Sequence, residues 1–241
     1  MTDLTPEPAP ETDADAIREE LREATRRLVR TTDALPDAAY AEPSGLPDWT
    51  RAHVLAHLAL NAEGLARALT GVIDGASAWM YASDQARDDD IATLAAASPS
   101  RIRERVLAAC TLLSNAIDAV PPDQADTIIE RSPGGRRFRV GDVPRMRLQE
   151  VEVHHADLDA GYDRGRWRAP FAAGLVDAMR TRVQVSTGFT AHASDVDRSW
   201  TFGDGGPVVS GALVDLAWWL TGRGSGEGLT SDGEMPRIGG I

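Results

Sequence analysis

Four of the five histidines fall in two short segments with helical spacing. His53 and His57 lie in RAHVLAHLALN, and His154 and His155 lie in RMRLQEVEVHHADLDAGY. Glu150 precedes His154 by four residues, so a helix places these two side chains one turn apart on the same face. With a histidine from the first segment, they make a set of two imidazoles and one carboxylate. Such a set suits zinc with one coordination position left open.

The Glu150–His154 pair also has a simpler interpretation. Residues four apart on an exposed helix face form surface contacts that stabilise the helix only slightly. However, the segment carries Leu148, Val151 and Val153, so part of its circumference must be buried. A carboxylate and an imidazole on an interior face need a polar partner, and a divalent metal ion would provide one. We therefore predict that Glu150 and His154 are metal ligands.

The third ligand is predicted to be His57. It lies mid-helix among leucines, whereas His53 falls in the first and more exposed turn of the same helix. Taken alone, His57 would more safely be interpreted as a histidine of the core. Glu152 and His155, three residues apart, form a competing pair on another part of the second helix.

Arg87 is a candidate for binding an anionic group. It lies in ASDQARDDDI, on a segment predicted to be irregular, beside Asp88, Asp89 and Asp90. A surface ion pair with one of these carboxylates is the simpler interpretation. Alternatively, its guanidinium provides a bidentate clamp for a substrate carboxylate or for an enolate that develops during a reaction.

The composition restricts the classes of function. The chain has 241 residues, a net charge of −12 and 42% hydrophobic residues. This charge argues against nucleic acid and anionic membranes as partners, and no apolar run is long enough to span a membrane. All 25 basic residues are arginine, which excludes Schiff-base and lysine general-base mechanisms. The single Cys110 permits no internal disulfide, and we expect it to lie in the core.

The candidate ligands must be positioned by long helices. Apolar periodicity, capping residues and prolines predict four of them, over residues 14–35, 50–70, 98–120 and 143–160. An irregular connection that ends in a helix start separates the second from the third, and a hairpin around a Pro-Gly-Gly turn precedes the fourth. These elements predict a four-helix bundle with the histidines on separate helices.

The composition changes after Tyr162, where a short basic linker leads to predicted helices and strands around Gly-rich turns. The predicted fold class is therefore α+β, in three parts. Residues 1–12 form an acidic, proline-rich tail, expected to be disordered and not a secretory signal. Residues 13–163 form the metal-binding helical bundle, and residues 166–241 form a small α+β domain. We expect a cytoplasmic protein.

Four segments together resemble one family. They are LPDWTRAHVLAHLALNAEGL, WMYASDQARDDDI, RMRLQEVEVHHADLDAGY and WTFGDGGPVVSGALVDLAWWLTGRGSGEGL, in that order along the chain. They resemble the mycothiol-dependent maleylpyruvate isomerase family, and the first is also similar to the wider DinB-like superfamily. Two departures concern the substrate. Leu60 stands where a polar residue is expected, and the tail EMPRIGGI lacks the ending typical of the isomerases.

This resemblance implies a DinB-like four-helix bundle that holds a divalent metal, usually zinc, followed by a small α+β domain. By motif match, the family's metal ligands fall on His57, Glu150 and His154, and its catalytic arginine falls on Arg87. The resemblance also implies mycothiol as the cofactor and a small electrophile as the substrate. The expected reaction converts maleylpyruvate to fumarylpyruvate. In it the thiolate adds to the double bond, the resulting single bond rotates and the thiol is eliminated.

Three other functions stay open. A mycothiol S-transferase would use the same thiol but release an S-conjugate, whereas isomerisation returns the thiol. A non-catalytic, metal-dependent binding protein on the same bundle would bind the thiol without turning over an electrophile. Hydrolysis by a metal-activated water is a further alternative.

Overall fold

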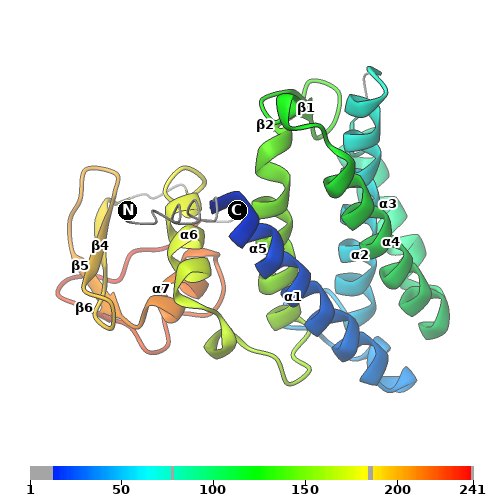
Figure 1. Ribbon diagram of the computed structural model, residues 1–241. Helices are drawn as coiled ribbons and strands as arrows, with labels where there is room; N and C mark the ends of the chain where they lie inside the picture. The colour runs from blue at the N-terminus through cyan, green and yellow to red at the C-terminus, as the bar shows by residue number, and fades with distance from the viewer. Residues whose placement is uncertain (1–12, 77–78, 184–186, 240–241) are drawn as a thin grey trace, which may run out of the picture. The chain divides into compact units, whose positions relative to one another are not determined.

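The described part of the chain is mostly helical, with a small sheet toward its C-terminal end (Figure 1). The structure is a computed structural model that describes residues 13–76, 79–183 and 187–239. The predicted disordered tail, residues 1–12, lies outside the described residues. Within the described ranges, no helix is both long and apolar enough to span a membrane. The predicted α+β class is confirmed.

Four long helices make up the bundle: α1 (Asp13–Ala34), α2 (Arg51–Ile73), α4 (Pro99–Ala119) and α5 (Val143–Asp157). Helix α2 packs against α4 and α5, and α1 packs against α5 (Figure 1). Each helix is held by the apolar face that it buries. The predicted four-helix bundle is therefore confirmed, and α2 and α5, which carry the histidines, are in contact.

Local sequence determines where α2 and α4 begin. Thr50 and His53 form a reciprocal capping box at the start of α2, in which His53 Nδ1 accepts a hydrogen bond from the backbone N–H of Thr50. At the start of α4, Ser98 Oγ accepts a hydrogen bond from the backbone N–H of Arg101, and Pro99 occupies the first turn.

A further helix, α3 (Asp84–Ala95), follows α2 in the sequence and packs against it. The sequence pattern predicts an irregular segment around Arg87, and this prediction is wrong. Ser83 caps the helix by accepting a backbone hydrogen bond from its first turn. The helix has no wide apolar stripe, since Ile91 and Leu94 are its buried residues. Hydrophobic periodicity therefore could not reveal it.

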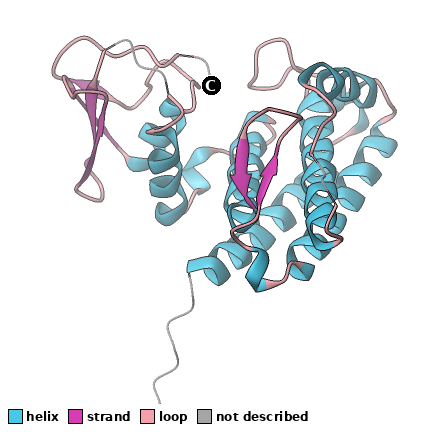
Figure 2. Ribbon diagram, turned by 90° about the horizontal axis from the view of Figure 1, so that it is seen from above, coloured by secondary structure: helices cyan, strands magenta, loops and turns pink. Residues whose placement is uncertain are grey.

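A short hairpin precedes α5, as the Pro-Gly-Gly turn predicts. Strands β1 (Ile128–Glu130) and β2 (Arg137–Arg139) pair antiparallel, with Ile129 opposite Phe138 (Figure 2). Both of these side chains are buried. Three short 3-10 segments accompany these elements in the bundle: η1 (Asp37–Ala41), η2 (Pro122–Gln124) and η3 (Val140–Asp142).

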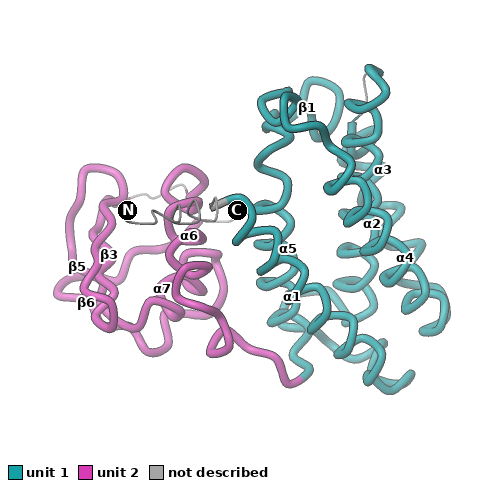
Figure 3. Tube along the Cα trace, viewed as in Figure 1, with its two compact units in different colours: residues 1–160 teal, residues 161–241 magenta. Residues whose placement is uncertain are grey.

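The chain divides into two compact units, residues 1–160 and 161–241 (Figure 3). In the second unit, strand β3 (Phe189–Ala193) pairs antiparallel with β4 (Arg198–Phe202) and parallel with β5 (Val208–Gly211). With β6 (Thr230–Ser231) at one edge, the sheet order is β4-β3-β5-β6. Phe189 stacks on Phe202, with ring centroids 4.6 Å apart, and Trp219 packs edge-on against Phe189. The helical elements of this unit are η4 (Arg164–Arg166), α6 (Ala169–Met179) and α7 (Leu213–Leu220).

Helix α4 leaves part of its apolar surface uncovered. The sequence predicts that Cys110 lies in the core, and this prediction is wrong because Cys110 is only half-buried. Its neighbours Leu107 and Leu112 are 52% and 51% exposed. The reason is tertiary: α1 packs mainly against α5 and α4 packs mainly against α2, so the side of α4 that carries Cys110 and Leu107 is only partly covered.

Candidate metal centre

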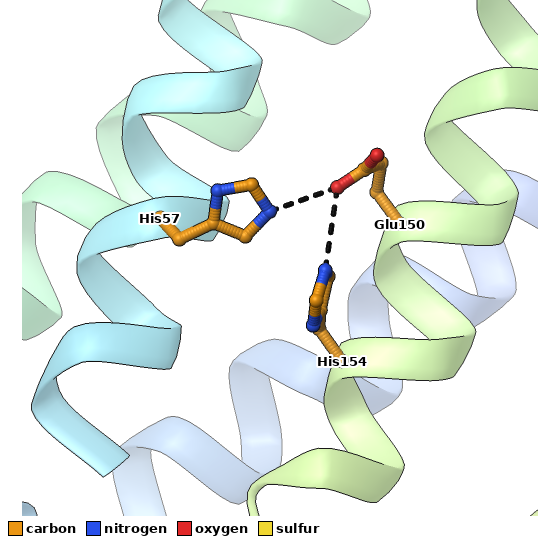
Figure 4. A group of neighbouring side chains, drawn as sticks. All are labelled: His57, Glu150 and His154. Atoms are coloured by element: carbon orange, nitrogen blue, oxygen red, sulfur yellow. Dashed lines mark hydrogen bonds and ion pairs between the residues drawn. The ribbon is translucent and has the colours of Figure 1, made fainter. Parts of the chain in front are cut away.

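Three side chains from two helices meet inside the bundle (Figure 4). His57 Nε2 lies 2.9 Å from Glu150 Oε2, and His154 Nε2 lies 3.5 Å from the same oxygen. The two imidazole rings meet edge to face, with centroids 4.6 Å apart. One potential ligand atom of each residue lies within 4.8 Å of the other two. The structure thus brings together the three residues that the sequence singles out.

Burial and mutual contacts determine the charge of this centre. Burial lowers the pKa of His57 to about 4, so its imidazole is neutral at pH 7. Desolvation opposes ionisation of Glu150, but hydrogen bonds with His154 and His57 lower the pKa of its carboxyl well below the ordinary value. Desolvation also opposes protonation of His154, but hydrogen bonds with Asp157 and Glu150 raise its pKa. The centre therefore presents an ionised carboxylate to a cation.

Asp157 orients the ring of His154. Its Oδ2 lies 2.8 Å from His154 Nδ1, and the residue is fully buried. This hydrogen bond holds the proton on Nδ1 and turns Nε2 toward Glu150, which is the arrangement of a histidine ligand supported by a carboxylate. Asp157 was not predicted from the sequence, although its position three residues after His154 is a usable signal.

Arg87 lies next to His57 but on the far side of the imidazole ring from Glu150. Its Nη2 is 3.2 Å from His57 Nδ1, and its Nη1 is 2.6 Å from Asp88 Oδ1. A guanidinium has no acceptor, so Arg87 is the donor and His57 Nδ1 is the acceptor. Both interpretations of Arg87 thus have a structural counterpart: a surface ion pair with Asp88, and a cation beside the histidine cluster.

Comparison with known proteins places the chain in a family. The family model described as "Mycothiol maleylpyruvate isomerase N-terminal domain" matches residues 4–159. The chain belongs to this family. Two crystal structures of the mycothiol-dependent maleylpyruvate isomerase, one of them a histidine-to-alanine mutant, share the fold with TM-scores of 0.88 and 0.87. Each is 25% identical, and each match covers 95% of this chain and 97% of the other. No curated protein matches the sequence.

The centre of this maleylpyruvate isomerase family member has a donor set that fits a divalent metal. A tetrahedral ion with ligand bonds of about 2.0–2.2 Å holds its ligand atoms roughly 3.3–3.6 Å apart. The 3.5 Å between His154 Nε2 and Glu150 Oε2 falls in this range, whereas the 2.9 Å between His57 Nε2 and Glu150 Oε2 is a hydrogen-bond distance that would lengthen when an ion binds. Asp157 accepts a hydrogen bond from Nδ1 of His154, as carboxylates beside metal-bound histidines do, whereas Arg87 donates to Nδ1 of His57 and so favours the metal-free tautomer of that ring.

The other candidate metal ligands that the sequence suggests lie outside the centre. His53 contributes to the cap of α2. Glu152 accepts a hydrogen bond of 2.6 Å from Arg27, and His155 Nε2 lies 2.7 Å from Thr31 Oγ1, so both face α1. Their polar groups thus serve contacts between helices.

Tyr81 is a neighbour of the centre that was not predicted from the sequence. It is buried, and burial raises the pKa of its hydroxyl, with a further increase from the charge of Glu150. Arg131 lies over its ring, 5.3 Å from the centroid. No spacing signal links Tyr81 to the histidines, because it follows α2 in an irregular connection.

Proposed function

We propose that this chain is a mycothiol-dependent and metal-dependent isomerase that converts maleylpyruvate to fumarylpyruvate. The observation that carries the proposal is the convergence of His57 Nε2, His154 Nε2 and Glu150 Oε2, with a guanidinium directly beside it. When bound, a divalent metal would favour the thiolate form of mycothiol, whose reversible addition turns the cis double bond into a rotatable single bond.

The residues of the chain have distinct roles in this proposal. His57, Glu150 and His154 would hold the metal, and Asp157 keeps Nε2 of His154 directed at it. Arg87 would bind a substrate carboxylate or stabilise the negative charge that develops on the substrate oxygen during addition. Cys110 takes no part, since it does not belong to the histidine cluster. The proposed place of action is the cytoplasm.

Product analysis tests this function. Metal-loaded protein is incubated with maleylpyruvate, with and without mycothiol, and fumarylpyruvate and free thiol are measured over time. We expect fumarylpyruvate only when the thiol is present, with all of the thiol recovered. The double variant His57→Ala/His154→Ala is the matched control and should form no product.

Other outcomes would favour the alternatives. Consumption of thiol with formation of an S-conjugate from another electrophile would identify a mycothiol S-transferase. Stoichiometric binding of mycothiol without turnover would identify a metal-dependent binding protein. Either result would overturn the isomerase proposal while retaining the metal centre.

A further inference from the structure

A groove between α1 and α4 shares no lining residue with the histidine cluster. Its volume is about 530 Å³, a size typical of pockets that hold small organic molecules. The floor is apolar, with buried Leu21, Leu113 and Ile117, and exposed Leu107 forms part of the wall. His57, Glu150, His154 and Arg87 do not line it.

A buried arginine also lines this groove. Arg147, on α5, is only 2% exposed. Its Nη1 donates a hydrogen bond of 2.7 Å to Asn61 Oδ1, and its Nη2 lies 3.9 Å from Cys110 Sγ. Both partners are neutral, and no carboxylate in the described part of the chain forms an ion pair with Arg147. Buried charges in proteins are normally paired, because an uncompensated charge is costly to desolvate.

Further positive charge lines the groove along α1. Arg18, Arg22, Arg26 and Arg30 follow one another at four-residue spacing and therefore share one face of the helix. Arg22 and Arg26 pair with acidic side chains, whereas Arg18 and Arg30 form no ion pair with any described residue. Among the described residues that line the groove, Asp118 is the single carboxylate, against five arginines. This excess of positive charge stands out in a chain whose net charge is −12.

We propose that the groove binds an organic carboxylate with an apolar body. The carboxylate pairs with Arg147, whose planar guanidinium matches the geometry of two carboxylate oxygens. The apolar body lies between α1 and α4 against Leu21, Leu113 and Ile117. A neutral ligand would leave the charge of Arg147 unpaired. A ligand without an apolar body would leave the apolar side chains of the groove exposed to water. The proposal does not depend on the isomerase function.

The probe is 2-naphthoate, with the neutral 2-naphthamide as its comparison. The full chain is titrated by calorimetry both metal-loaded and after chelation, so that coordination to a metal cannot account for binding. We expect one equivalent of 2-naphthoate to bind with the same Kd in both forms. We expect 2-naphthamide to bind at least about tenfold more weakly, the loss typical of a missing charged hydrogen bond.

Two leucines of α4 provide a matched pair of variants that do not disturb the core. Leu107 and Leu112 are 52% and 51% exposed, but only Leu107 lines the groove. Leu107→Glu introduces a carboxylate that repels the ligand, and it should weaken 2-naphthoate binding at least about tenfold. Leu112→Glu should change the Kd less than about twofold.

The half-buried Cys110 reports where the ligand binds. We expect saturating 2-naphthoate to slow alkylation of Cys110 by iodoacetamide in the wild type. The absence of saturable binding, binding unaffected by Leu107→Glu, or an unchanged alkylation rate would overturn the proposal. So would a dimer in light scattering that Leu107→Glu converts to a monomer, because a second copy of the chain would then cover the groove.

Discussion

Arg87 Nη2 donates a hydrogen bond of 3.2 Å to His57 Nδ1, the ring nitrogen on the opposite side from Glu150. A neutral imidazole carries one proton, so His57 in this state holds that proton on Nε2, facing Glu150. A metal bound at Nε2 requires the other tautomer, with the proton on Nδ1. The guanidinium N–H of Arg87 and the Nδ1–H of His57 would then be two donors that face each other. We predict that metal binding releases Arg87 from His57 and frees its guanidinium for an anionic substrate.

The tautomer of His57 can be observed directly. Nitrogen NMR of labelled protein should show the proton on Nε2 without metal and on Nδ1 with metal, and crystal structures should show Arg87 turned away from His57 only in the second state. An Arg87–His57 hydrogen bond that persists in the metal-loaded protein would contradict this prediction.

Replacement of Arg87 should impair the reaction without removing the metal. For Arg87→Ala we expect kcat/KM for the isomerisation to fall by about 10²–10³, the usual cost of losing one charged group that stabilises developing negative charge. Arg87→Lys should restore only part of the loss, because an ammonium cannot form the bidentate contact. Metal content, measured by elemental analysis, should stay at the wild-type value. Full activity of Arg87→Ala would rule out this role.

The two histidines of α2 should differ sharply in their contribution to metal binding. His57→Ala removes one of three ligands, and we expect the protein to lose stoichiometric metal after dialysis. His53→Ala is the matched control on the same helix. It removes one part of the capping box, so it should keep the metal and lose about 0.5–2 kcal/mol of stability. Elemental analysis and urea denaturation of both variants separate the two roles.

More of the metal centre than of its surroundings could be predicted from the sequence. Glu150 and His154 owe their proximity to helical spacing within α5, which is a local property of the chain. The choice of His57 rested on its mid-helix position among apolar residues, and the structure places it against Glu150. Arg87 was one of two open interpretations until the resemblance gave it a role, and its helix was missed because its apolar stripe is narrow.

The groove beside Arg147 could not be predicted from the sequence. It depends on which helices of the bundle pack closely and which stay apart, and the same packing leaves Cys110 half-buried. Periodicity shows that a helix has an apolar face, but it does not show how completely a neighbouring helix covers that face.

Metal affinity should depend on pH with a defined sign. Protons compete with the metal for the ligand nitrogens, so affinity falls wherever a ligand is protonated in the free protein. The raised pKa of His154 means that this histidine is protonated first as the pH falls, whereas His57, with a pKa of about 4, stays neutral. Below the pKa of His154 we expect the affinity for zinc to fall about tenfold per pH unit, corresponding to one displaced proton. A fall of a hundredfold per unit between pH 5 and 6, measured by competition with a chelator, would show that His57 titrates as well.

Asp157→Asn tests the support of His154 without changing a ligand. The asparagine has the same shape but no charge, so it cannot favour the protonated imidazole as the buried carboxylate does. We expect metal affinity at pH 7.5 to fall by about 10–100-fold, as for other partners of metal-bound histidines. Because the pKa of His154 should also fall, the decline of affinity with acid should begin at a lower pH than in the wild type. Asp159→Asn is the matched control, since Asp159 is exposed and asparagine tolerates its positive φ of 50°. Equal metal affinity and an identical pH profile in Asp157→Asn and Asp159→Asn would show that the ring of His154 is held by its packing rather than by the carboxylate.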